Sequence, residues 1–112
     1  MVGYRLGTEG SIQEIRTGKM KVLEHRRFQF YGDVQGVGFR WRAYHNARDL
    51  GLAGWVRNEY DGSVTMEVQG EREKIQRLIQ ILQNERWIDI RFYDEKDLPY
   101  DPHMEEDFRI AD

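Results

Sequence analysis

The pattern of hydrophobic and polar positions predicts a first core strand that begins near Arg26. Phe28 and Phe30 are separated by the polar Gln29, which is the period-two pattern of a strand with one buried face. Gly32 is expected to end this strand.

Helical periodicity follows in the next stretch of the chain. The apolar positions there are Phe39, Ala43, Ala47 and Leu50. Their spacing predicts a first helix, and Gly51 stands where a helix end commonly needs a left-handed residue. The same spacing returns at Ile75, Leu78, Ile79 and Leu82. It predicts a second amphipathic helix from about Glu71 to Asn84.

A hairpin is predicted between the two helices. Its first strand covers roughly residues 52–58, and Asp61-Gly62 is a strong turn signal. The alternating apolar residues after the turn are Val64, Met66 and Val68. This alternation predicts a second strand with one buried face.

Two further strands are predicted toward the C-terminus. Their alternating residues are Ile88, Ile90 and Phe92 in one, and Phe108 and Ile110 in the other. A polar loop containing Pro99 and Pro102 joins them. The resulting order, β-α-β-β-α-β, predicts an α+β, ferredoxin-like fold with one mainly antiparallel sheet and two helices on one face.

The start of the chain differs from the rest because it is polar and punctuated by glycines. We therefore predict that residues 1–25 form an N-terminal appendage, a candidate flexible segment, and that residues 26–112 form the domain. Ser11 and Glu14 stand in the capping-box relation, which predicts a short helix before Gly18.

Length and composition favour one compact domain, with 112 residues of which 39% are hydrophobic. The absence of cysteine excludes a disulfide framework and a thiolate nucleophile. A net charge of −3 provides no global field for nucleic acid or an anionic membrane, so any anion site is local. With no apolar run long enough to span a bilayer and no signal-type N-terminus, a cytoplasmic location without a membrane partner is expected.

The connection between the first strand and the first helix is the most informative segment. It reads Gly32-Asp33-Val34-Gln35-Gly36-Val37-Gly38-Phe39-Arg40. Its glycines allow positive φ angles, so successive N–H groups can converge on an anion beside the positive end of the helix. Arg40 adds a charged fork that can hold two phosphate oxygens. By composition alone, a plain glycine-rich turn with a solvated Arg40 is the commoner alternative. No Gly-Lys-Ser/Thr follows, which argues against a Walker loop.

This segment resembles the acylphosphatase signature G-x-V-Q-G-V-x-F-R. The second block of that family is similar to Gly51-Leu52, Gly54-Trp55-Val56-Arg57-Asn58 and Asp61-Gly62-Ser63-Val64, at the family's usual separation. The similarity runs from about Arg27 to Ile110. It implies a hydrolase that splits acyl phosphates, which are carboxyl-phosphate mixed anhydrides, into a carboxylate and inorganic phosphate.

The resemblance also implies a role for individual residues. Arg40 and Asn58 are the implied catalytic residues: Arg40 binds the phosphoryl group together with loop amides, and Asn58 orients the water for in-line attack. The implied phosphate-binding residues are Val34, Gln35, Gly36, Val37, Gly38, Phe39 and Arg40. Inorganic phosphate or sulfate is the expected site ligand and a small acyl phosphate the substrate. No cofactor and no metal is expected, and family habit favours a monomer.

Three alternatives belong to other functional classes. A non-catalytic phosphate- or partner-binding module would share the fold and the loop, but the presence of both Arg40 and Asn58 argues against it. A domain for carbamoyl phosphate chemistry in hydrogenase maturation would be attached to large additional domains, which this chain is expected to lack. An RNA-binding ferredoxin-like domain would need a basic face, which the net charge disfavours.

Structural roles are expected for the remaining conspicuous side chains. His25, His45 and His103 lack the spacing of metal ligands and are expected at the surface. Trp55 is expected to pack on the sheet. Asp33 is expected to oppose an anionic ligand unless it points to solvent.

Overall fold

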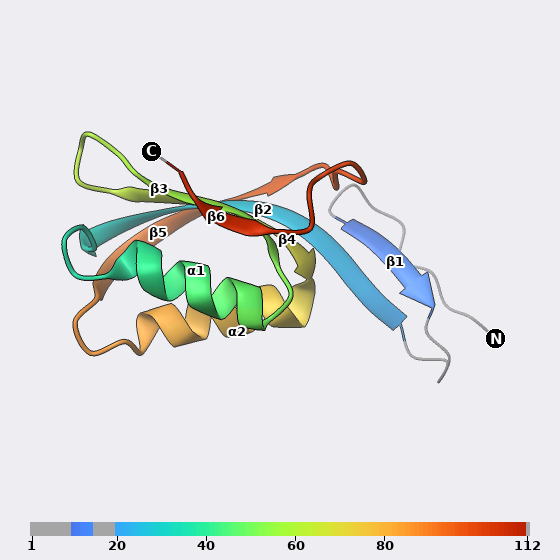
Figure 1. Cartoon of the computed structure of the whole chain (residues 1–112), viewed down its shortest axis with the longest axis horizontal. Helices are drawn as coiled ribbons and strands as arrows, with labels where there is room; N and C mark the ends of the chain where they lie inside the picture. The colour runs from blue at the N-terminus through green and yellow to red at the C-terminus, as the bar shows by residue number, and fades with distance from the viewer. Residues whose placement is uncertain (1–9, 15–19, 112) are drawn as a thin grey trace.

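The computed structural model describes residues 10–14 and 20–111. One mixed sheet is covered on one face by both helices, as Figure 1 shows. The elements are β1 (Gly10–Glu14), β2 (Met20–Asp33), α1 (Phe39–Asp49), β3 (Ala53–Asn58), β4 (Val64–Glu71), α2 (Arg72–Gln83), β5 (Asp89–Leu98) and β6 (Phe108–Ile110). This arrangement confirms the predicted ferredoxin-like α+β class and both predicted helices. No helix in the described ranges is long and apolar enough to cross a membrane.

The long strand β2 organises the sheet. β4 pairs with it antiparallel along one edge, while β5 and β1 pair with successive parts of its other edge. β4 also pairs antiparallel with β3, and β6 lies parallel to β3. The predicted hairpin and the predicted final strand are therefore confirmed.

The hydrophobic core lies between the sheet and the helices. The ring of Phe30 lies 5.7 Å from that of Phe28 and 5.0 Å from that of Phe39 at the start of α1. Ala43 and Ala47 are fully buried, and their small side chains allow α1 to lie close to the sheet. The core thus fixes the start of α1, where the glycine-rich loop ends.

The N-terminal part of the described chain differs from the prediction. Residues predicted to begin a helix at Ser11 form strand β1 instead, and β2 begins at Met20 rather than near Arg26. The physical reason is strand pairing. β1 forms an antiparallel ladder with β2, in which Gly10 lies opposite Glu24, and the hydrogen bonds of this ladder stabilise the segment more than a short isolated helix would. Residues 1–9 and 15–19 of the predicted appendage lie outside the described ranges, and the division at residue 25 stays a prediction.

Strand β5 contains an irregularity that reverses its expected pattern. Tyr31 pairs with Phe92 but Gly32 pairs with Ile90, so Arg91 is an extra residue. Such a bulge shifts the alternation of side chains by one. Phe92 therefore lies on the open face of the sheet, away from the helices, and stacks on Tyr31 with centroids 4.6 Å apart. The prediction that Phe92 shares a face with Ile90 is wrong for this reason.

His25 is buried, so the expectation that it lies at the surface is also wrong. Its Nδ1 lies 3.0 Å from the carbonyl oxygen of Pro99, and its Nε2 lies 3.0 Å from a carboxylate oxygen of Glu67. Both ring nitrogens thus have a polar partner within the fold. Arg27 donates to the other oxygen of Glu67 at 2.6 Å, which offsets the burial of that carboxylate.

Gly54 permits the close approach of β3 and β4, and its replacement tests this packing. Gly54 has φ +138°, and an added Cβ would lie 2.0 Å from the carbonyl oxygen of Glu67. We expect Gly54→Ala to lower the free energy of unfolding by about 3 kcal/mol or more, because strain and overlap add.

Gly62→Ala is the matched control for this prediction. Gly62 has φ +91°, but nothing lies within 4 Å of an added Cβ. We expect a loss of only about 1–2 kcal/mol from backbone strain. Urea unfolding of both variants is the measurement, and equal losses would contradict the close approach at Gly54.

Candidate active site

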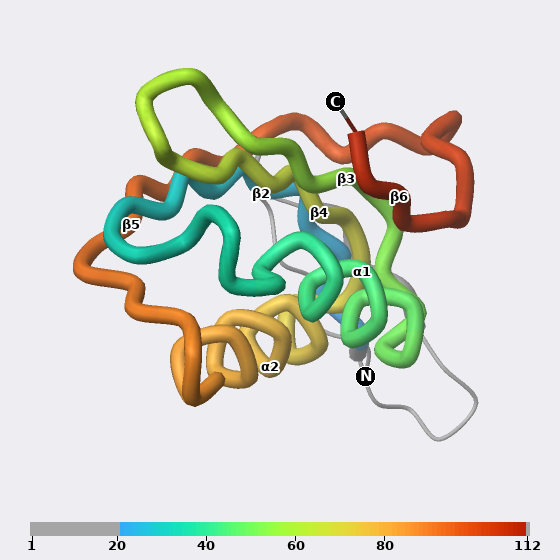
Figure 2. The backbone as a smooth tube through the Cα atoms, turned by 60° about the vertical axis from the view of Figure 1, so that its left-hand side comes forward, coloured from blue at the N-terminus to red at the C-terminus, as the bar shows by residue number. Residues whose placement is uncertain are grey.

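The end of β2 and the end of β3 lie at the same edge of the sheet. Both strands run antiparallel to β4, so they run parallel to one another, and Val64 pairs with Phe30 on one side and with Asn58 on the other. Neighbouring strands are about 4.8 Å apart, which places Asn58 roughly 10 Å from Phe30. The β2–α1 loop and the β3–β4 turn consequently emerge together, as both Figure 1 and Figure 2 show.

The β2–α1 loop presents its backbone to solvent. Gly36 and Gly38 have φ angles of +73° and +83°, and nothing lies within 4 Å of a Cβ added to either. Glycine is needed at both positions for the left-handed conformation rather than for packing. The side chains of Val34 and Phe39 are buried in the core, so these two predicted site residues can offer a ligand only their backbone.

The start of α1 leaves several amides without a helical partner. The first helical hydrogen bond runs from the amide of Arg42 to the carbonyl of Gly38 at 3.0 Å. The amides of residues 39–41 precede it and belong to the unpaired first turn. No side chain caps this end, and no acidic residue lies in the first turn. The loop therefore ends in a positively polarised helix terminus suited to an anion.

Helical geometry indicates the side to which Arg40 projects. Arg42 lies 3.8 Å from Glu85, which follows α2, whereas Arg48 lies 3.0 Å from Asp107, which precedes β6. At roughly 100° per residue, Arg40 lies about 80° from Arg48 and about 160° from Arg42. Arg40 thus projects on the flank that faces β6 and β3. Its side chain is half-buried and has no ion-pair partner among the described residues.

Asn58 occupies a position that otherwise suits a hydrophobic residue. It shares the helix-facing side of β3 with the buried Val56, and its partner Val64 is fully buried. The Oδ1 atom of Asn58 is buried and has no hydrogen-bond partner among the described residues. Buried acceptors are normally paired, so an unpaired one calls for an explanation. This acceptor lies on the face and at the edge of the sheet where the free amides of α1 also lie.

Gln35 has a structural contact that its place in the sequence motif does not reveal. Its Nε2 donates to the carbonyl oxygens of Glu59 at 2.7 Å and Ser63 at 2.9 Å. The loop is thereby tied to the β3–β4 turn.

Within the β3–β4 turn, Asp61 accepts from the amide of Ser63 at 2.9 Å, and the hydrogen bonds from Ser63 lower the pKa of Asp61. The sequence signal for the contact between Asp61 and Ser63 is an aspartate two residues before a serine in a turn.

The other singled-out residues lie outside this arrangement. Asp33 is exposed to solvent, which is the condition under which it is expected not to oppose an anionic ligand. Trp55 lies on the open face with the guanidinium of Arg57 4.9 Å from its ring centroid. His45 and His103 are exposed. The described residues contain no group of three or more His, Asp or Glu that could hold a metal ion.

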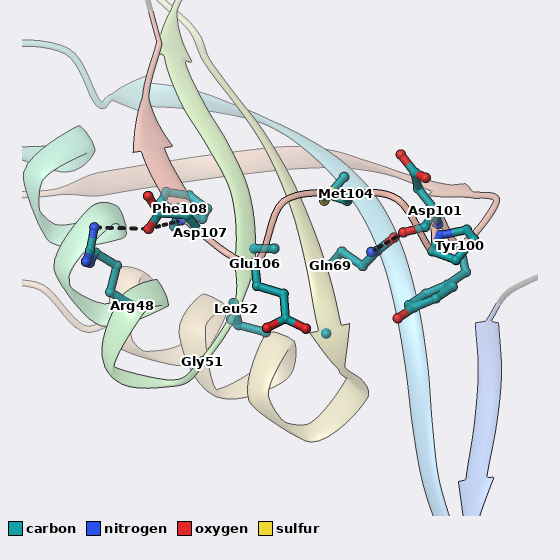
Figure 3. Close-up of a pocket in the computed structure, with 13 residues that line it drawn as sticks. Arg48, Gly51, Leu52, Gln69, Tyr100, Asp101, Met104, Glu106, Asp107 and Phe108 are labelled. Atoms are coloured by element: carbon teal, nitrogen blue, oxygen red, sulfur yellow. Dashed lines mark hydrogen bonds and ion pairs between the residues drawn. The ribbon is translucent and has the colours of Figure 1, made fainter.

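A separate groove lies at the opposite edge of the sheet, between the α1–β3 turn and the C-terminal loop (Figure 3). Gln69 exchanges two hydrogen bonds of 2.8 Å with the backbone of Asp101 there. Arg48 and Asp107 form the ion pair at its other side. Gln69 thus holds the C-terminal loop on the sheet and Arg48 holds it on α1, so these two side chains are already engaged.

The fold and the edge that carries the β2–α1 loop define a class of protein: a ferredoxin-like α+β domain with a glycine-rich loop that leads into a helix. Residues 26–110 match the family model for acylphosphatase. The chain belongs to the acylphosphatase family.

Individual relatives agree with this assignment. The acylphosphatase of Picrophilus torridus is 40% identical over 81 residues, which cover 72% of this chain and 94% of that protein. The acylphosphatase of Thermoplasma volcanium is 39% identical over 90 residues, which cover 80% of this chain and 98% of that protein. The crystal structure of acylphosphatase from Bacillus subtilis has a TM-score of 0.72 at 28% identity and covers 80% of this chain and 98% of that one.

The contact between Gln35 and the β3–β4 turn predicts a measurable effect on anion binding. Gln35→Ala removes two hydrogen bonds, so we expect a loss of about 1–3 kcal/mol in the free energy of unfolding. We also expect weaker binding of inorganic phosphate, because the loop is no longer held against the turn. Urea unfolding and phosphate titration by calorimetry are the measurements.

Gln29→Ala is the matched control, because Gln29 donates to the side chain of Ser63 at 2.9 Å without belonging to the loop. It is expected to lower stability while leaving phosphate affinity unchanged. Phosphate affinity that is the same in both variants and the unmodified chain would show that Gln35 does not position the loop.

Proposed function

We propose that this chain hydrolyses acyl phosphates by in-line attack of a water held by Asn58 on a phosphoryl group bound by Arg40 and the loop of residues 34–40. Membership of the acylphosphatase family supports the general activity. The observation that carries the mechanism is the buried, unpaired Oδ1 of Asn58 at the edge where the free amides of α1 lie.

Binding of the phosphoryl group falls to the backbone and one side chain. The free amides of the loop and of the first turn of α1 donate to phosphate oxygens. Arg40 supplies a permanent charge and two parallel N–H donors to the same group. Since these donors are fixed by the core and by the contact of Gln35, they stabilise the charge on the transferring group without reorganising.

Asn58 has a different task, which is to place the nucleophile. Its Oδ1 accepts an O–H of the water, and this leaves a lone pair of the water oxygen directed at phosphorus. The new bond forms between the water oxygen and phosphorus, while the bond from phosphorus to the acyl oxygen breaks. The carboxylate leaves with that electron pair, and an oxygen of the phosphate takes the proton of the water.

The reaction needs little further chemistry because a carboxylate is already a good leaving group. Positioning and charge stabilisation supply most of the effect in phosphoryl transfer. The proposal includes metal-independent turnover, because Arg40 and the amides neutralise the charge of the phosphate. It also includes a monomer as the active form.

Substitution of the two catalytic residues is expected to give different kinetic defects. Arg40→Ala should lower kcat/KM for acetyl phosphate about a thousandfold or more and abolish phosphate binding, because it removes a bidentate charged contact. Asn58→Ala should lower mainly kcat and leave phosphate affinity within about threefold, because a misplaced water costs orientation rather than affinity.

Arg42→Ala serves as the control for the loss of an arginine from the first turns of α1, since Arg42 projects toward Glu85. Its turnover is expected to be close to that of the unmodified chain, and circular dichroism verifies folding of all three variants. A folded Arg40→Ala variant with normal turnover would falsify the mechanism, and near-normal kcat in Asn58→Ala would remove the role of Asn58.

Inorganic phosphate and sulfate are expected to inhibit competitively against acetyl phosphate, because they fit the same amides and Arg40. Steady-state rates measured at several phosphate concentrations in EDTA test this, with turnover unaffected by the chelator. Noncompetitive inhibition would place the anion elsewhere. Loss of activity in EDTA with recovery on adding magnesium would contradict the metal-free mechanism.

A further inference from the structure

The direction of the leaving group follows from the direction of attack, provided that the proposed function holds. In an in-line displacement the attacking and leaving oxygens lie on opposite sides of phosphorus. Asn58 holds the water on the β3 side of the loop. The acyl group must then leave on the side of the loop that faces away from β3.

The segment between α2 and β5 lies on that side. Along this edge of the sheet the strands follow the order β5, β2, β4, β3. Glu85 contacts Arg42 in α1 at 3.8 Å, and Asp89 pairs with Asp33 at the end of β2. Residues 84–88 therefore lie next to the phosphate loop, across from the β3–β4 turn. In Figure 2 the β2–α1 loop runs between these two segments.

This segment exposes a large aromatic side chain at its tip. Trp87 is 69% exposed although its neighbour Ile88 is buried in the core. The guanidinium of Arg86 lies 5.1 Å from the ring centroid of Trp87. Ile88 anchors the backbone while the indole stays accessible, which is the arrangement of a contact surface for a flat apolar group.

We propose that Trp87 is a specificity residue that contacts the acyl group, and that the chain favours acyl phosphates with a flat apolar acyl group. Such a contact requires no polar partner and adds to the phosphate contacts that all acyl phosphates share. It gives a benzoyl group a stacking partner that an acetyl group is too small to use.

Two other exposed aromatic residues do not fit this role. Trp41 lies roughly 200° around α1 from the buried Phe39, so it faces away from the core, and its ring lies 3.9 Å from that of His45. Tyr60 lies at the tip of the β3–β4 turn, in a depression that includes Asn58. That depression is on the side of the attacking water.

The test is the ratio of kcat/KM for benzoyl phosphate to kcat/KM for acetyl phosphate. Trp87→Ala is expected to lower this ratio about three- to tenfold, mainly through a higher KM for benzoyl phosphate. Turnover of acetyl phosphate and inhibition by phosphate are expected to stay within about twofold. Trp87→Phe should restore most of the ratio, whereas Trp41→Ala and Tyr60→Ala should leave it unchanged.

Two results separate failure of this inference from failure of the proposed function. The first result is normal turnover of acetyl phosphate with an unchanged ratio in Trp87→Ala, or with an equal drop of the ratio in Trp41→Ala. Either outcome would overturn the role of Trp87 alone. A folded unmodified chain that hydrolyses neither compound would overturn the proposed function and the specificity contact with it.

Discussion

The pairing of β2 and β3 with the same strand, β4, is the constraint on which the site depends. It brings both strand ends to one edge, and the alternation of side chains then places Asn58 on the face that carries Phe30 and the helices. A slip of one residue in the register would turn Asn58 to the open face. The fully buried side chains of Phe30 and Val64 oppose such a slip, because it would expose them. The row of residues that forms the core thus also positions the site.

A chain of net charge −3 can bind phosphate only where its carboxylates are kept away or neutralised. Glu24 is fully buried at the other end of β2 and binds Arg26 at 2.8 Å and Arg72 at 2.7 Å. Burial opposes the charge of Arg26, yet Glu24 and its acidic neighbours raise the pKa of Arg26 above its ordinary value. Glu67 is similarly bound by Arg27. In these two places the charge of a buried carboxylate is met by arginines, whereas Arg40 at the start of α1 has no ion-pair partner among the described residues.

The features that depend on local pattern could be predicted from the sequence. Apolar spacing predicts both helices and the hairpin, and the resemblance of two motifs to the acylphosphatase family implies that Arg40 and Asn58 act on one substrate. The details of long-range pairing could not be predicted. The bulge at Arg91 depends on how β5 meets β2, and the burial of His25 depends on a loop that arrives more than 70 residues later. The acceptors of Gln35 are backbone carbonyls, which every residue has, so composition carries no signal for them.

The groups that form the site also lower the stability of the folded chain. Gly36 and Gly38 lose more conformational freedom on folding than other residues would, and a buried acceptor without a partner costs about 1–3 kcal/mol. A hydrophobic side chain in place of Asn58 would continue the row of Phe30 and Val64 and remove that cost. In the proposed mechanism the attacking water donates a hydrogen bond to this buried Oδ1 and supplies the missing partner. In that mechanism, the burial that makes the unpaired Oδ1 costly also strengthens its hydrogen bond to the water, so the loss in stability and the gain in positioning have one physical cause.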